Sequence, residues 1–345
     1  MRIPRRLTVL ALTLLTPIVL GGQAADPLPE VEQVLRKVNF TAADLTMLQG
    51  GMVVARANAE KSGEIVTQAA VRILAPHAQV VSYYGQMISY VDGQVIQGFG
   101  QFSTPALLSD VAKLTFDRND IDALKSCRAG NCDVRIGGAG LSAMQAAIDW
   151  KAPDYPDRVN EFARQTVVDY VTAYRARGDE ALVTYNDNSK AVSLKSEWSS
   201  LLSRARNVHA FVPELARYLS GFPNDSLAGA RDIIYWIKED YGQKPIVSVV
   251  HAVMYTPKAG EDRTVVAQKY IYTSHYYDAS LAVAWIASGT ENGAPVTYIL
   301  YSNRSRGDLL RGGFGGIARS VAEKMAREGA EQTLSMIKLV LEGRK

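Results

Sequence analysis

Residues 246–255 (IVSVVHAVMY) begin the stretch that decides the fold, because three more apolar runs follow them closely in the chain. The turn Glu291-Asn292-Gly293 separates the last two runs, and Asn-Gly between apolar runs is a strong hairpin signal because both residues tolerate positive φ. Connections this short leave no room for the crossover that parallel strands need. We therefore predict an antiparallel meander with strands at Ile246–Tyr255, Thr264–His275, Ser280–Ser288 and Val296–Asn303.

The period of the apolar residues changes after Asn303. They then recur at steps of three and four, the spacing of one helical face, at Ile317, Val321, Met325, Leu334, Ile337 and Leu341. A sheet with one apolar face needs a cover, and an adjacent amphipathic helix can supply it. We therefore predict an α+β fold in which a curved antiparallel sheet grips a long C-terminal helix over about Gly316–Glu342. Such an architecture often holds a cavity.

Residues 1–25 have the layout of a secretory signal. An arginine-rich start, Arg2–Arg6, precedes the apolar run Leu7–Leu20, and small residues follow up to Ala24 and Ala25. The apolar run is short for a membrane span, although an uncleaved N-terminal anchor is the alternative. We expect cleavage near Ala24 or Ala25 and a periplasmic or secreted protein.

The charge balance argues against nucleic-acid binding. The chain has 38 basic and 35 acidic residues, and three of the basic ones lie in the signal segment. The rest of the chain is close to neutral, whereas a protein that binds phosphate backbones needs a basic surplus on some face. We therefore expect no nucleic-acid partner, and keep a transient contact with a membrane surface open.

The two cysteines, Cys127 and Cys132, stand in the sequence CRAGNC. In an exported protein such a pair is by default a disulfide, and Gly130-Asn131 supplies the turn that so small a loop needs. A redox dithiol normally has two intervening residues, haem attachment needs a following histidine, and a zinc site needs two further ligands. We predict a structural disulfide, no metal site and no cofactor.

The N-terminal part alternates helical and strand patterns. The hairpin turns at Lys61-Ser62-Gly63, and Pro76 stands where a helix tolerates proline, at its start. The expected elements are a helix within Asp26–Gly50, a hairpin of Met52–Asn58 and Ile65–Leu74, a helix over Gln79–Val91 and a strand over Val95–Phe102.

The strand that ends in VRILAP, Val71–Pro76, leads into a helix and then a strand, and a long helix closes the chain. This arrangement resembles the START-like (SRPBCC, helix-grip) superfamily of lipid-transfer domains, polyketide cyclases and related ligand binders. The resemblance is architectural, covers Gly51–Phe102 and Pro245–Glu342, and includes no diagnostic motif. It implies a helix that borders a cavity and a hydrophobic or amphipathic small-molecule partner.

Residues 103–242 are expected to be mainly helical. Tyr155-Pro156-Asp157 begins one helix and Gly178 ends it. An insertion is favoured over a second domain, because the strands on either side would be incomplete alone. We predict one START-like domain over residues 26–345 with this insertion, whose expected helices are Leu107–Leu114, Asp120–Cys127, Val159–Arg177, Trp198–Leu202, Pro213–Leu219 and Ser226–Lys238.

Two histidines of the predicted sheet, His251 and His275, are weak candidates for acid–base catalysis, with Asp278 as a possible orienting group. The alternative is that each is hydrogen-bonded within a half-buried sheet. The chain contains no HExxH, GxSxG, Walker or SxxK motif. Ser274 and His275 are neighbours in a strand and so point to opposite faces, which makes a Ser-His pair geometrically poor.

Tyrosine is unusually frequent, with 17 tyrosines against 8 phenylalanines. Tyr270, Tyr272 and Tyr298 lie on the predicted C-terminal strands, where an apolar body with a polar tip suits the wall of a cavity for an amphipathic ligand. Tyrosines suit the solvent edge of a sheet equally well.

A glycine-rich turn with three arginines precedes the C-terminal helix. Arg304, Arg306 and Arg311 stand near free backbone N–H groups of a helix N-terminus, which favour an anion. We therefore expect an anionic head group or carboxylate near these arginines. The alternative is a flexible connection whose arginines are solvated or pair with nearby carboxylates.

These observations favour a non-enzymatic protein that binds, and possibly carries, a hydrophobic or amphipathic small molecule such as a lipid. Because this function rests on an analogy of fold, two alternatives stay open. One is an enzyme on the same scaffold, cyclase- or hydrolase-like, that uses the sheet histidines and tyrosines. The other is a structural or interaction protein of the cell envelope with a filled core.

Overall fold

The structure is a computed structural model that describes residues 29–60, 62–87, 95–240, 242, 244–257, 262–307, 310 and 315–343. The predicted signal segment and Arg311 lie outside the described residues.

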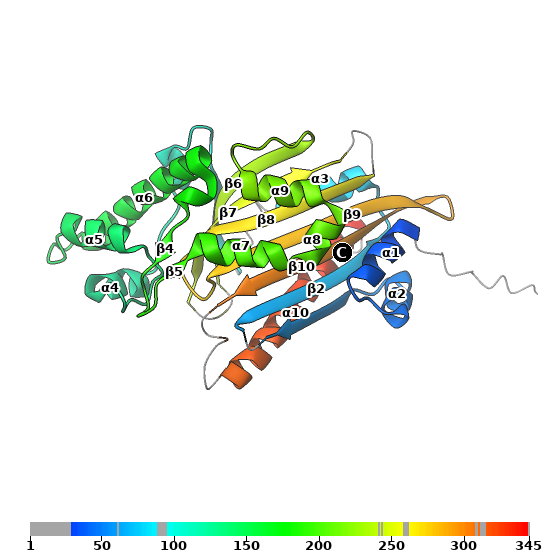
Figure 1. Cartoon of the computed structure of the whole chain (residues 1–345), viewed down its shortest axis with the longest axis horizontal. Coiled ribbons are helices and arrows are strands. Elements are labelled where there is room, and N and C mark those ends of the chain that lie inside the picture. The colour runs from blue at the N-terminus through cyan, green and yellow to red at the C-terminus, as the bar shows by residue number, and fades with distance from the viewer. Residues whose placement is uncertain are drawn as a thin grey trace, which may run out of the picture.

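An eight-stranded antiparallel sheet forms the centre of the molecule, in the order β1-β2-β10-β9-β8-β7-β6-β3 (Figure 1). The C-terminal meander is confirmed, since β7 to β10 pair consecutively, and β10 then pairs with β2. The strands are β1 Val54–Ala59, β2 Glu64–Ile73, β3 Ile96–Gln101, β6 Ala230–Glu239, β7 Ile246–Tyr255, β8 Arg263–Thr273, β9 Ala279–Glu291 and β10 Ala294–Arg306. A separate two-stranded ladder joins β4 Thr184–Tyr185 and β5 Val192–Ser193.

The turn between β9 and β10 confirms the hairpin prediction. Asn292 has φ of 50° and Gly293 has φ of 77°, the left-handed region that the two central residues of such a turn require. Asn and Gly are the residues that adopt this conformation with least strain.

One face of the sheet, here called the grip face, carries α10 Gly315–Leu341 and α3 His77–Met87. Helix α10 packs on β1 and β2, and α3 packs on β9 and β10. Three residues of α10 enter the core with side chains of β2 and β10: Leu334, Ile337 and Leu341. The predicted antiparallel sheet with a C-terminal helix across one face is therefore confirmed.

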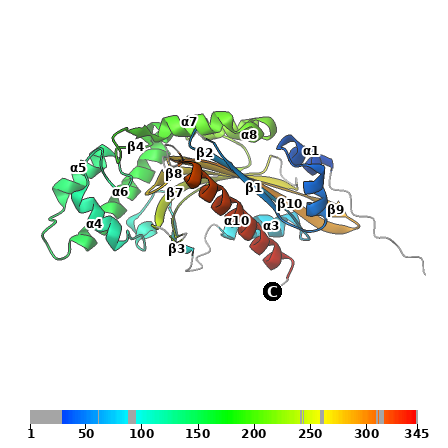
Figure 2. The same cartoon turned by 90° about the horizontal axis from the view of Figure 1, so that it is seen from below.

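The opposite face, here called the outer face, is covered by further helices. Successive residues of a strand point to opposite faces: Val266 packs with α10, whereas Val265 and Ala267 pack with α7 to α9. Figure 2 shows α1, α7 and α8 on one side of the sheet and α10 on the other. The outer helices are α1 Pro29–Lys37, α2 Ala42–Gln49, α6 Tyr155–Arg177, α7 Leu194–Arg204, α8 Arg206–Phe211 and α9 Pro213–Gly221.

The helical insertion extends beyond one end of the sheet. It adds α4 Arg118–Ser126, α5 Gly138–Ala147 and the short 3-10 helices η1 Leu108–Val111 and η2 Gly178–Ala181. The predicted disulfide between Cys127 and Cys132 is present, directly after α4. Gly178 has φ of 56° where α6 ends, as the predicted glycine stop requires.

Two predicted helices are wrong. The helix expected over Ser226–Lys238 is strand β6, because its run of β-branched and aromatic residues, Ile233–Ile237, favours a strand. The single helix expected within Asp26–Gly50 is two helices, separated by Asn39 with φ of 69°. Thr41 begins the second with a capping box to Asp44. Helices α5 and α8 were not predicted.

The apolar face predicted for the C-terminal helix is in fact two faces. Ile337 is fully buried, whereas Ile317 is 74% exposed and Val321 and Met325 are also exposed. The reason is the spacing from Met325 to Leu334. At about 100° per residue, it turns the helix by about half a circle, so the two halves of the pattern point in opposite directions.

Candidate functional site

The grip face of β6 to β8 lies beyond the strands on which α10 packs. Ala252, Gln268 and Ala282 lie side by side across it, on β7, β8 and the neighbouring β9. Five tyrosines surround this area and are here called the tyrosine cluster: Tyr84 of α3, Tyr235 of β6, Tyr270 of β8, Tyr277 after β8, and Tyr301 of β10.

The tyrosines come from distant parts of the chain but converge. Tyr235 and Tyr270 pack together in one apolar cluster with Phe99, whose ring centroid lies 5.4 Å from that of Tyr235. Tyr84 and Tyr301 share a second cluster on the same face. The side-chain amide of Gln268 donates to the Tyr235 hydroxyl at 3.0 Å.

Burial is the main influence on the ionisation of these phenols. It raises the pKa of Tyr84, Tyr235 and Tyr301 well above the usual value, and the neighbouring phenols raise it further. The pKa of Tyr277 is raised to about 12, first by burial and then by the carboxylate of Glu239. All of these phenols are therefore neutral hydrogen-bond donors at ordinary pH.

Several hydroxyls of this face lack a partner. In the described part of the chain, no hydrogen bond is made by the hydroxyl of Tyr84, which is 5% exposed, or by that of Tyr277. Ser248 pairs with Ile237 in the sheet register and so shares the grip face with the cluster. Its Oγ is buried without a partner, and the residue is 1% exposed. A buried serine hydroxyl is normally hydrogen-bonded, so Ser248 is the exception on this face.

The structure places only one of the three predicted ligand-binding tyrosines in this cluster. Tyr270 belongs to it, whereas Tyr272 and Tyr298 are on the outer face. The Tyr272 hydroxyl donates to the carbonyl of Arg135 at 3.0 Å, and the Tyr298 hydroxyl donates to Glu291 at 3.0 Å beneath α1. An extra residue in β8, opposite Val249 and Val250, moves Tyr272 away from the face of Tyr270.

The predicted arginines also lie away from the cluster. Arg304 pairs with Glu64, which pairs with Arg204 of α7 as well, and Arg306 pairs with Glu197 of α7 at 2.7 Å. Both arginines are in β10, on the side that faces α7. Arg311 lies outside the described residues. Binding of an anion by these arginines stays a prediction, and in this structure carboxylates already neutralise two of them.

His251 is buried on the outer face with both ring nitrogens bonded. Nδ1 lies 2.9 Å from the Tyr174 hydroxyl and Nε2 lies 2.8 Å from Oδ1 of Asp232. Burial lowers the pKa of His251 despite the opposing effect of Asp232, so the ring is neutral, accepts from Tyr174 and donates to Asp232. The residue is 0% exposed, so this arrangement suits a structural role, and catalysis by His251 stays an untested prediction.

His275 lies where the insertion meets the sheet. Its Nε2 is 3.0 Å from Oδ2 of Asp120 in α4, and both residues are buried. Close by, Arg135 of the insertion pairs with the buried Asp278 at 2.6 Å. Asp278, the orienting group expected for His275, is therefore engaged with a different residue. These contacts attach the insertion to the sheet, and catalysis by His275 also stays a prediction.

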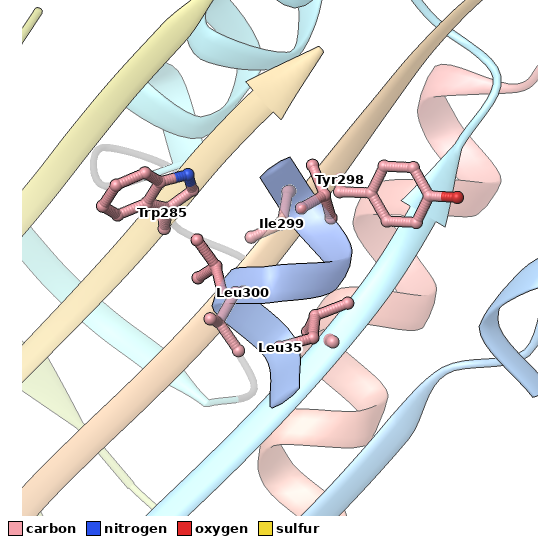
Figure 3. Close-up of a pocket in the computed structure, with 8 residues that line it drawn as sticks. Leu35, Trp285, Tyr298, Ile299 and Leu300 are labelled. Carbon is pink, nitrogen blue, oxygen red and sulfur yellow. The ribbon is translucent and has the colours of Figure 1, made fainter. Parts of the chain in front are cut away.

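Two small voids lie on the outer face. The first is lined by Val34, Leu35, Trp285, Tyr298 and Leu300, beneath α1 (Figure 3). The second lies between α8 and β9. Each has a volume of about 10 Å³, which is room for about one water. Neither could hold a lipid.

Within the described ranges, no group of three or more histidine, cysteine or acidic side chains is placed to hold a metal ion. Among the helices described, none combines the length and apolar character that crossing a membrane requires.

Comparison with known proteins adds little to the topology. No protein-family model and no curated protein matches the chain. A solved structure of norcoclaurine synthase from Thalictrum flavum, in complex with dopamine and hydroxybenzaldehyde, is similar over 45% of this chain and 83% of that one. The identity is 13% and the TM-score 0.19, and these values are too low to support any inference about this chain. The fit to the helix-grip architecture rests on the antiparallel sheet and α10.

Sequence reasoning missed most of the site. Of the tyrosine cluster, only Tyr270 is among the predicted ligand-binding residues, and Ser248 is not among them either. A signal was available, because Ser248 interrupts an otherwise apolar strand at a position that alternation assigns to the face of Val250 and Ala252.

Proposed function

We propose that this protein binds a hydrophobic or amphipathic small molecule, such as a lipid, on the grip face beside the tyrosine cluster. The observation that carries the proposal is the buried Oγ of Ser248, which has no hydrogen-bond partner on a largely apolar surface. Unpaired buried hydroxyls cost stability unless something satisfies them, and a bound molecule with polar groups would do so.

The chemistry of the surface supports an amphipathic ligand. Tyrosine offers an apolar ring and one polar tip, a combination that suits an amphipathic partner. The helix-grip architecture is compatible with such a site, although fold alone is a weak warrant for function. The proposal includes export of the protein, on the strength of the N-terminal sequence pattern.

The first experiment is native mass spectrometry of the protein purified from its own cell envelope, before and after organic extraction. We expect a co-purifying species of a few hundred daltons that extraction removes. A clean ligand-free mass, together with no thermal shift against a panel of lipids, would refute the proposal.

Phenylalanine variants locate the site. The double substitution Tyr84→Phe and Tyr277→Phe removes both unpaired phenol hydroxyls and keeps the rings. If each hydroxyl bonds the ligand, affinity falls by about thirtyfold, since each net hydrogen bond contributes about 1 kcal/mol. Tyr272→Phe is the matched control, because it removes a hydroxyl that is bonded on the outer face. An equal loss of affinity in the control would place the ligand elsewhere.

A further inference from the structure

Helix α10 has a long apolar face that the rest of the described chain does not cover. In Figure 2, α10 lies in front of the sheet and no other described element crosses it. Six of its large apolar residues, here called the exposed stripe, are 41–74% exposed: Ile317, Val321, Met325, Met336, Leu339 and Val340. At about 100° per residue they share one side of the helix, opposite to the residues that pack on the sheet. A continuous stripe of this kind marks an interaction surface, whereas single exposed apolar residues need no explanation.

Gly329 lies in the middle of the exposed stripe. Glycine inside a helix is less stable than alanine, and a Cβ at this position would meet nothing within 4 Å. Packing within the described part of the chain therefore gives no reason for glycine here. A helix surface without a Cβ lets the backbone of another helix come close.

The charged residues along one edge of the exposed stripe stand in a self-complementary order. Two basic residues, Lys324 and Arg327, come before two acidic ones, Glu328 and Glu331. Arg327 and Glu328 of one chain lie 3.5 Å apart as an exposed pair, and Lys324 and Glu331 have no ion-pair partner in the described part of the chain. In an antiparallel copy of the helix the order is reversed, so each basic residue faces an acidic one.

The apolar residues fit the same symmetry. A two-fold axis between Arg327 and Glu328 places Lys324 opposite Glu331 of the second copy, twice. The same axis lays the N-terminal half of the exposed stripe over its C-terminal half in the second copy. Gly329 then stands next to the axis, where the two helix backbones cross.

We infer that two copies of this chain associate through α10, with the two helices antiparallel around a two-fold axis between Arg327 and Glu328. A two-fold contact uses the same patch on both copies, so the patch must complement itself, as the exposed stripe and its charged edge do. A membrane surface is the other candidate cover, but a helix that lies on a bilayer is rich in lysine and arginine beside its apolar face, whereas this edge sums to zero. The inference does not depend on the proposed function, because the exposed stripe points away from the sheet.

Sedimentation velocity of the full chain over the micromolar range measures the association. We expect the mass to rise with concentration from that of one chain to that of two. Val321→Lys places a charge in the exposed stripe and should raise the dissociation constant at least about tenfold. Leu107→Lys is the matched control, because both residues are 49% exposed but Leu107 lies in the insertion. An equal loss in the control would overturn the role of α10.

Charge reversal tests the orientation of the two helices. Lys324→Glu alone places two acidic residues opposite each other and should weaken association about fivefold. Adding Glu331→Lys restores opposite charges and should recover most of the affinity. A double variant as weak as the single one would overturn the antiparallel arrangement.

Cysteine crosslinking locates the axis. The two native cysteines form a disulfide, so an introduced cysteine is the free thiol. Gly329→Cys should join two copies on mild oxidation, whereas Val321→Cys should not, because its two copies would lie about 20 Å apart in the antiparallel pair. Equal crosslinking at both positions, or none at Gly329, would overturn this axis.

The wild-type protein gives the remaining decision. A chain that stays monomeric at every concentration would overturn the inference. If that monomer floated with vesicles of phosphatidylglycerol and phosphatidylethanolamine, and Val321→Lys did not, the exposed stripe would be assigned to a membrane surface instead.

Discussion

Ser248→Ala should stabilise the ligand-free protein, the reverse of what most core substitutions do. The hydroxyl of Ser248 is buried and has no hydrogen-bond partner. A buried polar group without a partner costs about 1–3 kcal/mol, and the removal of one oxygen leaves only a small void that offsets part of the gain. We therefore expect the free energy of unfolding to rise by about 1 kcal/mol, which corresponds to about 2 °C in Tm for a chain of this size.

The neighbouring Thr273 provides the matched control. It lies opposite Ser248 on β8, is equally buried, and its Oγ1 donates to the carbonyl of Tyr277 at 2.7 Å. Thr273→Val keeps the shape of the side chain but removes a hydrogen bond that is made, so it should lower the free energy of unfolding by about 1–2 kcal/mol. The two hydroxyl deletions should thus have opposite signs.

The assay is urea unfolding of protein from which lipid has been stripped on a hydrophobic resin, followed by fluorescence, with the m-value checked for each variant. A fall of 1 kcal/mol or more in the free energy of unfolding of Ser248→Ala would refute the reasoning. It would mean that the hydroxyl is already hydrogen-bonded, for example to a buried water. With saturating ligand, Ser248→Ala should instead lower the free energy of unfolding, because the variant lacks a hydrogen bond that the wild type makes to the ligand.

Three further substitutions test the fold. The folded-state pKa of His251 lies below its usual value of 6.5, so below that pH the unfolded chain binds the proton more tightly and stability falls with acidification. His251→Gln should reduce this dependence of the free energy of unfolding on pH, measured by urea titrations between pH 7 and about 5. An unchanged dependence would show that other groups cause it. Ile337→Ala, at a side chain that is 0% exposed, should lower the free energy of unfolding by about 3 kcal/mol. Leu339→Ala on the same helix, at a residue that is 50% exposed, should change it by no more than about 0.5 kcal/mol. Comparable losses of stability in thermal unfolding would contradict the packing of α10. Glu64→Gln leaves Arg204 and Arg304 without their shared carboxylate. Because both arginines can reach solvent, the cost should be about 2 kcal/mol, against almost nothing for Glu328→Gln in an exposed pair. Similar midpoints in urea for the two variants would argue against a structural role for Glu64.

The sequence was sufficient for those parts of the fold that depend on local pattern. The meander was predictable because its strands are joined by short turns, and Asn292-Gly293 specifies one of them almost alone. The disulfide followed from two cysteines whose spacing and flanking residues fit neither a redox dithiol nor haem attachment. Strand β6 was missed because the run from Ile233 to Ile237 has no alternation that would distinguish a strand buried on both faces from a helix.

The site was harder to predict because it depends on which face each residue occupies. One extra residue in β8 is enough to send Tyr272 to the outer face and leave Tyr270 on the grip face. The partners of Arg304 and Arg306 come from Glu64 and from α7, far away in sequence, so no local pattern could show that these arginines are neutralised. Convergence of Tyr84 with Tyr301 likewise requires the tertiary structure.

The pairing of β2 with β10 has a consequence for how the chain folds. Residues 64–73 of β2 pair with residues 297–306 of β10, so the sheet cannot be completed until almost the whole chain has been synthesised. Contacts this distant in sequence make folding slow, because the loop between the two strands must close before any of the contacts form. Until then, β2 and the meander each present an open edge to other chains. The chain would therefore need protection from aggregation until β2 and β10 have paired.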